Sequence, residues 1–389
     1  DCGPLSASKA DLQVPARSGL ERADLVTIDG SHGEGGGQIL RTALSLSAIT
    51  SRPFRIVNIR ATRQNPGLRP QHLSATRAAA AITGAILTGD QIGSSELTFT
   101  PKHKPRSGAY EFDVAEIAGH GSAGSAILIL QTVLVPLALT PGNSKVFVRG
   151  GTHQKWAPTF YHLADSYLPA LHRMGLSASA DLVQWGWYPA GGGEILCNVA
   201  GAPDIGSRGG WPKPMDLIKR GQLSRIPGRA GAANIPGVAR VAERMANRAG
   251  VMLRELCVPV RVDPLNVRAT CSGAGTFLLA EYENVAASFS ALGRQGKRAE
   301  IVGDEAAAAL LKHHSSDAAI ELHLCDQLLV PLAVAASPSC FTMARPTAHL
   351  TTNAWTIEQF GIAKITIAQD TLTHVRVVPC PRRIDLPQS

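Results

Sequence analysis

Aromatic residues and paired cysteines are scarce in this chain of 389 residues. Phe, Trp and Tyr make up 5% of it, and none of the seven cysteines forms a C-x-x-C pair. The sequence therefore indicates neither a zinc site built on cysteine pairs nor a disulfide framework, and a reducing compartment is expected. Because few aromatics lie among the basic residues, stacking on a run of nucleic-acid bases is not indicated either.

An uninterrupted hydrophobic run is also missing. Residues 123–139 are apolar for nearly the span of a bilayer, but Gln131 interrupts the run and Pro136 lies near its end. No second span accompanies it, so we expect a buried core helix that carries one placed amide, and no membrane partner. Residues 1–23 lack a continuous apolar stretch, which predicts a flexible extension and not a signal peptide.

The composition is that of a globular protein with a modest excess of positive charge. Hydrophobic residues make up 44% and charged residues 17%, which excludes a disordered chain and a coiled coil. The 38 basic and 30 acidic residues give a net charge of +8, which mildly favours a polyanionic partner. At about 150 residues per domain, the length allows two or three domains.

The first part of the chain alternates strands with helices in the order β-α-β-α-β-β. We expect helices at 38–49 and 71–83, and strands at 25–28, 54–60, 96–101 and 110–114, the last two forming a pair. Two fragments then recur. VLVPLAL at 133–139 returns as LLVPLAV at 328–334, and GGGQ at 35–38 returns as GGGE at 191–194. These echoes indicate copies of one α/β unit that share a core.

A glycine-rich turn at residues 33–38 is predicted to join a strand to a helix. Adjacent glycines and the amides of a helix N-terminus favour a bound phosphate. The spacing matches neither a P-loop nor a dinucleotide fingerprint. Glu34 would repel a phosphate, unless a divalent metal lies between the two. The alternative is a tight structural turn with an exposed Glu34.

A basic segment, RATRQNPGLRPQHL, follows the second predicted strand. Its turn at Pro66-Gly67 separates arginines at a strand end from polar side chains at a helix start. Guanidinium groups suit phosphate because they are planar donors with permanent charge. The segment is either a phosphate site or a solvated basic loop. Its candidate residues, together with Arg77 four positions after its end, are Arg60, Arg63, Arg69, Gln71 and His72.

One histidine near the C-terminus is a candidate nucleophile. His349 lies among small and hydroxyl residues, and imidazole is mostly uncharged at neutral pH. Asp326, just before the second copy of the repeated fragment, is its candidate acidic partner. The alternatives are a structural or exposed histidine and an exposed aspartate at a helix start. The loop that begins Gly150-Gly151-Thr152-His153 is a weaker candidate for a ligand wall.

Seven blocks of this sequence, in their order, closely resemble the RNA 3′-terminal phosphate cyclases. They span nearly the whole chain and are DGSHGEGGGQILRTALSLSAI, RATRQNPGLRPQHL, AGSAILILQTVL, GGTHQKWAP, YPAGGGE, CDQLLVPLA and AHLTTN. The resemblance implies an α/β (α+β) fold in which three repeated β-α-β-α-β-β units form a large domain with a smaller inserted α/β domain. On that basis we expect an N-terminal extension at 1–23, repeats 1 and 2 at 24–210, the insert at 211–315, repeat 3 at 316–380 and a tail at 381–389.

The resemblance also implies a chemistry. Family members use ATP and a divalent cation, Mg²⁺ or Mn²⁺, to convert an RNA 3′-phosphate into a 2′,3′-cyclic phosphate. A histidine that matches His349 becomes covalently bound to AMP, which then passes to the RNA end. The implied partner is RNA with a 3′-phosphate, and the implied location is cytoplasmic, or nuclear in a eukaryote.

The family match assigns roles to further residues. Glu34 matches the metal ligand, with Gln38 and Arg41 beside it, and Arg60, Arg63, Gln71 and His72 match positions that line the nucleotide and RNA-phosphate site. The expected ATP-binding set comprises Gln38, Arg41, Gln131, Pro158, His323, Leu324, Cys325, Asp326 and Gln327.

Some positions depart from the family pattern, and alternatives stay open. His323 stands where a tyrosine that packs on adenine is common, which puts nucleotide selectivity in doubt; His153 and Lys155 are also atypical. A noncatalytic ribosome-assembly relative, an enolpyruvyl transferase and an unrelated anion-binding protein are the other candidates. In the insert, the basic residues either contact RNA or are solvated charges; these are Arg220, Arg225 and Arg229. Oligomeric state and physiological RNA stay open.

Overall fold

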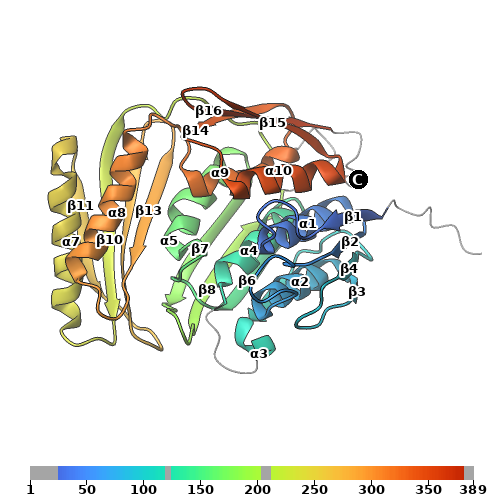
Figure 1. The fold of residues 1–389 in the computed structure, drawn as a ribbon, viewed down its shortest axis with the longest axis horizontal. Coiled ribbons are helices and arrows are strands. Elements are labelled where there is room, and N and C mark those ends of the chain that lie inside the picture. The colour runs from blue at the N-terminus through green and yellow to red at the C-terminus, as the bar shows by residue number, and fades with distance from the viewer. Residues whose placement is uncertain (1–24, 119–123, 203–211, 381–389) are drawn as a thin grey trace, which may run out of the picture.

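The computed structural model describes residues 25–118, 124–202 and 212–380, and these form four four-stranded sheets surrounding and flanking a set of helices (Figure 1). Mixed sheets combined with helices confirm the expected α/β class. Three of the sheets share one strand order. In each, the first two strands are parallel, and the fourth lies antiparallel between the second and the third.

The first two of these units follow one another along the chain. The first comprises β1 (Val26–Asp29), α1 (Gly37–Thr50), β2 (Phe54–Val57), α2 (Pro70–Thr83), β3 (Ile86–Thr88) and β4 (Leu97–Thr100). The second comprises β5 (Ala109–Asp113), α3 (Val114–Ala118), α4 (Ala126–Ala138), β6 (Asn143–Gly150), α5 (Phe160–His162), the π-helical turn η1 (Leu163–Tyr167), α6 (Leu168–Arg173), β7 (Ser177–Gln184) and β8 (Gly193–Ala200).

The third unit is interrupted by a module with another strand order. Its elements are β9 (Asp216–Leu217), α9 (Leu322–Ala333), β14 (Ser339–Met343), α10 (Ala348–Phe360), β15 (Ala363–Gln369) and β16 (Thr373–Pro379). The interrupting module, ordered β11-β10-β12-β13, comprises β10 (Leu223–Ala233), α7 (Val238–Leu253), the 3₁₀ turn η2 (Arg254–Leu256), β11 (Val260–Asn266), β12 (Gly273–Tyr282), β13 (Ala286–Leu292) and α8 (Ala299–His314). Since β9 pairs with β14, residues 216–217 belong to the third sheet, although the sequence analysis assigned 211–315 to the insert.

One expected strand pair is wrong. The segments 96–101 and 110–114 form β4 and β5, but these strands lie in different sheets. β4 instead pairs with β3, a three-residue strand that the sequence pattern missed because it is too short to show alternation. β5 pairs in parallel with β6 and begins the second unit.

The helices of the three units pack on one another in the core. α1 contacts α2, α4 and α10, and α9 contacts α10 and α4 (Figure 1). Every residue of α4 except Gln131 is buried, which confirms a core helix with one placed amide. Within residues 25–118, 124–202 and 212–380, none of the helices combines the length and the apolar character that crossing a membrane requires.

An aromatic cluster fastens the insert to the second unit. Trp185 and Trp187 pack against glycines of the insert sheet: a Cβ on Gly231 would lie 2.7 Å from Trp185, and one on Gly273 would lie 2.1 Å from Trp187. His153 stacks on Trp185 with ring centroids 4.2 Å apart, and burial lowers its pKa well below the usual value. The atypical His153 is therefore an uncharged member of this aromatic cluster.

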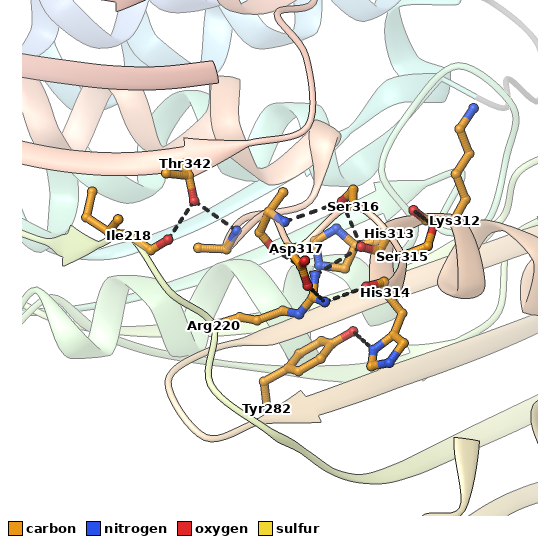
Figure 2. Close-up of polar contacts among 12 residues, drawn as sticks. Ile218, Arg220, Tyr282, Lys312, His313, His314, Ser315, Ser316, Asp317 and Thr342 are labelled. Atoms are coloured by element: carbon orange, nitrogen blue, oxygen red, sulfur yellow. Dashed lines mark hydrogen bonds and ion pairs between the residues drawn. The ribbon is translucent and has the colours of Figure 1, made fainter. Parts of the chain in front are cut away.

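A buried arginine, Arg220, links the two segments that connect the insert to the third unit. Arg220 lies between β9 and β10, and its guanidinium donates hydrogen bonds to the carbonyls of His313 (3.0 Å), His314 and Ala318 (3.1 Å) (Figure 2). These carbonyls belong to the end of α8 and the segment that returns to the third unit. Arg220 thus adds donors to a helix C-terminus that Ser315 and Ser316 also cap.

Two further contacts complete the Arg220 cluster. Asp317 accepts a hydrogen bond at 3.1 Å, and the guanidinium lies 4.9 Å from the ring centre of Tyr282. With both terminal guanidinium nitrogens engaged and its side chain 8% exposed, Arg220 does not offer a surface for RNA. Arg225 pairs with Glu281, and Arg229 pairs with Asp165, so neither is an unpaired cation.

Replacing Arg220 by methionine is expected to lower the free energy of unfolding by about 2–4 kcal/mol, because the buried Ala318 carbonyl and the partly buried His314 carbonyl would lose their donor. Arg225→Met is the matched control: its ion pair is solvent-exposed, so its loss of stability should be much smaller than that of Arg220→Met. Urea unfolding followed by circular dichroism measures both. Equal losses in the two variants would contradict this role of Arg220.

Candidate active site

The glycine turn connects β1 to α1 and leaves the start of α1 open. Gly33 and Gly35 have φ angles of +59° and +58°, a region that favours glycine. A Cβ on Gly33 would also lie 2.3 Å from the hydroxyl of Thr352 on α10. Gly36 is the N-cap, and no side chain caps the helix there. The first amides of α1 are therefore oriented as they are in helix N-termini that bind anions.

Glu34 connects the first and third units at this turn. Its Oε1 accepts a hydrogen bond from Arg63 at 3.0 Å, and its Oε2 lies 3.1 Å from Nε2 of His349. Its main-chain amide donates to Thr352 Oγ1 at 3.3 Å, across 318 residues of sequence. The structure thus brings together three of the side chains singled out from the sequence.

His349 lies in the first turn of α10, where Thr347 is the N-cap. Its side chain is 49% exposed, so a ligand can reach it. Burial is the main reason why its pKa lies below the usual value; the charges of Arg41, His323 and Arg63 act in the same direction, and the Glu34 carboxylate opposes them. The ring is therefore mostly neutral at pH 7 and has a lone pair available.

Thr352 and Asn353 support this arrangement, although the sequence did not predict a role for either residue. They follow His349 by three and four residues, so they share its side of α10. Asn353 accepts a hydrogen bond from Thr42 of α1 at 2.5 Å and donates one to the carbonyl of Asp326 at 2.9 Å. The spacing within AHLTTN was the available signal for this contact between units.

Two ionisable groups lie next to the turn, of which Asp326 is buried and Arg41 is half-buried. Burial lowers the pKa of Arg41 to about 10, so it remains a cation, and its guanidinium donates to Gln38 Oε1 at 2.5 Å. The pKa of Asp326 is raised to about 8. Burial is the main cause, the nearby Glu321 acts in the same direction, and Arg41 opposes both. Asp326 is therefore mostly protonated at neutral pH and can donate a hydrogen bond.

His72 is oriented toward the start of α1. Its Nδ1 accepts a hydrogen bond from the amide of Arg69 at 3.1 Å, while burial and the surrounding arginines lower its pKa to about 3. The neutral ring therefore carries its proton on Nε2. A Cβ on Gly37 would lie 2.3 Å from that nitrogen, so Gly37 permits the close approach of His72.

The other members of the basic segment differ in what they contact. Arg60 has a φ of +54° and donates to the carbonyl of Asn65 at 2.6 Å, so it shapes its own loop. Gln71 lies in the first turn of α2, one residue after Pro70. Among the arginines of this segment, Arg63 is the one that forms an ion pair with Glu34.

The expected ATP-binding residues fall into two groups. Gln131 donates to Gln327 Oε1 at 2.8 Å, and this pair joins α4 to α9. His323 is exposed on α9, and Pro158 precedes α5. By contrast, Leu324 and Cys325 point into the core, with Cys325 Sγ donating to the carbonyl of Glu321. Their side chains are not positioned to touch a ligand.

Glu34 is the available carboxylate for a divalent cation at the turn. Among the described ranges of the chain, no group of three or more His, Cys, Asp or Glu side chains could hold a metal by itself. Mg²⁺, however, is commonly bound by one or two carboxylates together with phosphate oxygens and water. Glu34, next to the uncapped start of α1, fits that kind of shared site.

Taken together, these side chains can hold phosphate and perform nucleophilic chemistry. A neutral imidazole lies beside a carboxylate and a helix N-terminus, and cations flank them. The helix amides and arginines stabilise negative charge, and the imidazole can form a covalent bond.

Comparison with known proteins agrees with this chemistry. The family model described as RNA 3′-terminal phosphate cyclase matches residues 32–367. A protein of that name from Methylococcus capsulatus is 47% identical over 88% of this chain and 93% of its own length. Those from Nostoc punctiforme and Salmonella agona are 46% and 40% identical, over 88% and 87% of this chain and 96% and 92% of their own lengths. The chain therefore belongs to the RNA 3′-terminal phosphate cyclase family.

Proposed function

We propose that this protein uses ATP to convert an RNA 3′-phosphate into a 2′,3′-cyclic phosphate, with His349 as the nucleophile. The observation that carries the proposal is the 3.1 Å approach of His349 Nε2 to Glu34 Oε2 at the uncapped start of α1. That position gives a neutral imidazole access to a bound phosphate. The positive net charge of +8 favours a polyanionic partner such as RNA.

In the first step, His349 attacks the α-phosphorus of ATP. A P–N bond forms, the bond to the β-phosphate oxygen breaks, and pyrophosphate leaves. Nε2 is the attacking atom we assign, because it faces the glycine turn. For this step the ring proton lies on Nδ1, which frees the Nε2 lone pair, and the Glu34 carboxylate would bind the cation instead of accepting a hydrogen bond from Nε2. The adenylylated ring keeps its proton on Nδ1, so a neutral imidazole leaves when the P–N bond breaks in the next step.

In the second step, an oxygen of the RNA 3′-phosphate attacks the same phosphorus. The P–N bond breaks, His349 is regenerated, and AMP becomes joined to the RNA end by a phosphoanhydride. In the third step, the neighbouring 2′-hydroxyl attacks the RNA phosphorus, releases AMP and loses its proton. The enzyme mainly positions the reactants and offsets charge during these steps.

The surrounding residues are assigned by their chemistry. Arg41 and Arg63 offer permanent positive charge near Glu34, and His72 offers an Nε2 proton toward α1. Gln131 and Gln327 supply amides for the nucleotide, and the mostly protonated Asp326 supplies a donor. Gln38, Gln71, Pro158 and His323 complete the proposed lining, whereas Arg60, Leu324 and Cys325 support it from loop and core.

A divalent cation fits beside Glu34. Bound Mg²⁺ or Mn²⁺ would neutralise part of the triphosphate charge and orient its oxygens. Glu34 would hold it through the carboxylate that otherwise contacts Arg63 and His349. A noncatalytic ribosome-assembly role is the alternative, and the presence of Glu34, Gln38 and His349 in one place argues against it.

Incubation with ATP labelled at the α-phosphate is expected to leave an acid-labile, alkali-stable label on the protein. His349→Ala should reduce this label by at least about a hundredfold, because the nucleophile is gone. His374→Ala, which changes an exposed histidine on β16, is the matched control and should label normally. Label that persists in His349→Ala would remove the proposed nucleophile, and an unlabelled wild type would favour the noncatalytic alternative.

Glu34→Ala is expected to slow the formation of the labelled protein by about tenfold or more at low metal concentration and to recover partly at high Mn²⁺. The reason is that the cation would lose its protein ligand but keep its phosphate ligands. Glu96→Ala, which breaks an exposed ion pair with Arg55, serves as the control. Labelling rates that do not depend on Glu34 at any metal concentration would make it a turn residue only.

The pH dependence of self-adenylylation is expected to have an acid limb below about pH 6.5, where the imidazole becomes protonated, because the environment lowers the pKa of His349. Arg63→Ala should raise that pKa, since it removes a nearby positive charge and frees the Glu34 carboxylate. The acid limb should therefore move toward neutral pH. Single-turnover labelling rates between pH 5 and 8 measure the shift; an unchanged or lowered midpoint would contradict it.

A further inference from the structure

One buried histidine outside the proposed catalytic set contacts both the insert and α9. His162 ends α5, and its side chain is 8% exposed. Its Nδ1 lies 3.0 Å from Ser288 Oγ on β13 of the insert, and its Nε2 lies 3.2 Å from Gln327 Oε1 on α9. A single ring therefore connects the insert with the Gln131–Gln327 pair.

The hydrogen bonds define where the ring carries its proton. Gln327 Oε1 already accepts a hydrogen bond from Gln131 at 2.8 Å, so the same carbonyl oxygen accepts the Nε2 proton of His162. Nδ1 must then accept from the hydroxyl of Ser288. Burial is the main cause of the lowered pKa of His162 and keeps the ring neutral, although the Glu321 carboxylate opposes it.

Glu321 offers the ring a competing arrangement. Its Oε1 lies 3.7 Å from Nδ1 of His162 and has no hydrogen-bond partner among the described residues. Without the Ser288 hydroxyl, a proton on Nδ1 would be attracted to this carboxylate. Nε2 would then present a lone pair to Gln327 Oε1, and two acceptors would face each other. By donating to Nδ1, the Ser288 hydroxyl therefore stabilises the tautomer that holds Gln327 against the arrangement that Glu321 offers.

The insert is held against this segment by additional contacts. Arg229 of β10 pairs with Asp165 of η1 at 2.9 Å, and its guanidinium lies 4.6 Å from the ring centre of Tyr161. These contacts lie within the same short stretch as His162, so they fix the position of the insert sheet relative to α5 and η1. Ser288 is thus supported from its own side of the interface.

We propose that His162 is a positioning residue through which the inserted module sets the Gln131–Gln327 pair of the nucleotide site. The assignment of that pair to ATP rests on the proposed function. The insert acts on nucleotide binding without touching the nucleotide, because Ser288 controls the ring and the ring controls Gln327.

Ser288→Ala in the full-length protein tests the proposal. It should weaken ATP binding by about tenfold, measured by calorimetry in a His349→Ala background where no adenylylation occurs, while the extent of labelling of the His349 protein at saturating ATP stays unchanged. Ser288→Thr keeps the hydroxyl and should restore binding. Ser290→Ala is the matched control, because Ser290 lies on the same strand and is exposed. In a Gln327→Ala background, Ser288→Ala should have no further effect.

A second measurement does not depend on ATP. In protein with ¹⁵N-labelled histidine, His162 should show the Nε2–H tautomer in the wild type and the Nδ1–H tautomer in Ser288→Ala. An unchanged tautomer together with unchanged ATP affinity would overturn the inference and leave the proposed function intact. Equal weakening in Ser288→Ala and Ser290→Ala would also overturn it. A wild type that shows the predicted tautomer but binds no ATP would overturn the proposed function and the assignment of the glutamine pair that depends on it.

Discussion

The approach of His349 to Glu34 exists only because helices from different units share one core. Glu34 belongs to the first unit and His349 to the third, and packing of α1 against α10 brings the starts of these helices together. The hydrogen bonds of Asn353 to Thr42 and to the Asp326 carbonyl hold that packing in register. A few ångströms of displacement at this contact would separate a nucleophile from its phosphate-binding amides.

The sequence predicted most of the fold because its signals are local. Residues 123–139 indicated a buried helix with one exception, and α4 buries every residue but Gln131. β3 was missed because three residues cannot show an alternating pattern, and the pairing of β4 was assigned wrongly as a result. β9 has only two residues and finds its partner across the whole insert, so local pattern could not identify it.

The candidate site was predicted unevenly for a similar reason. Glycine spacing, clustered arginines and a histidine among hydroxyl residues are visible in the sequence. Whether a side chain faces a ligand or the core depends on packing, as Leu324 and Cys325 demonstrate. Burial also decides charge: it makes Asp326 mostly protonated and His153 part of an aromatic cluster. The proposed role of His162 depends on contacts among α5, β13 and α9, which are far apart in sequence, so no local motif could predict it.

The two-residue strand β9 has a consequence for how the chain folds during synthesis. Its partner β14 emerges from the ribosome only after the entire insert, and loop closure over such a distance is entropically costly. The insert, whose sheet closes among its own consecutive strands, can fold first. The Arg220 cluster then holds the segment that enters the insert next to the segment that leaves it. This shortens the length of free chain that must close for β9 to pair with β14. Once folded, the insert therefore lowers the entropic cost of forming the third sheet.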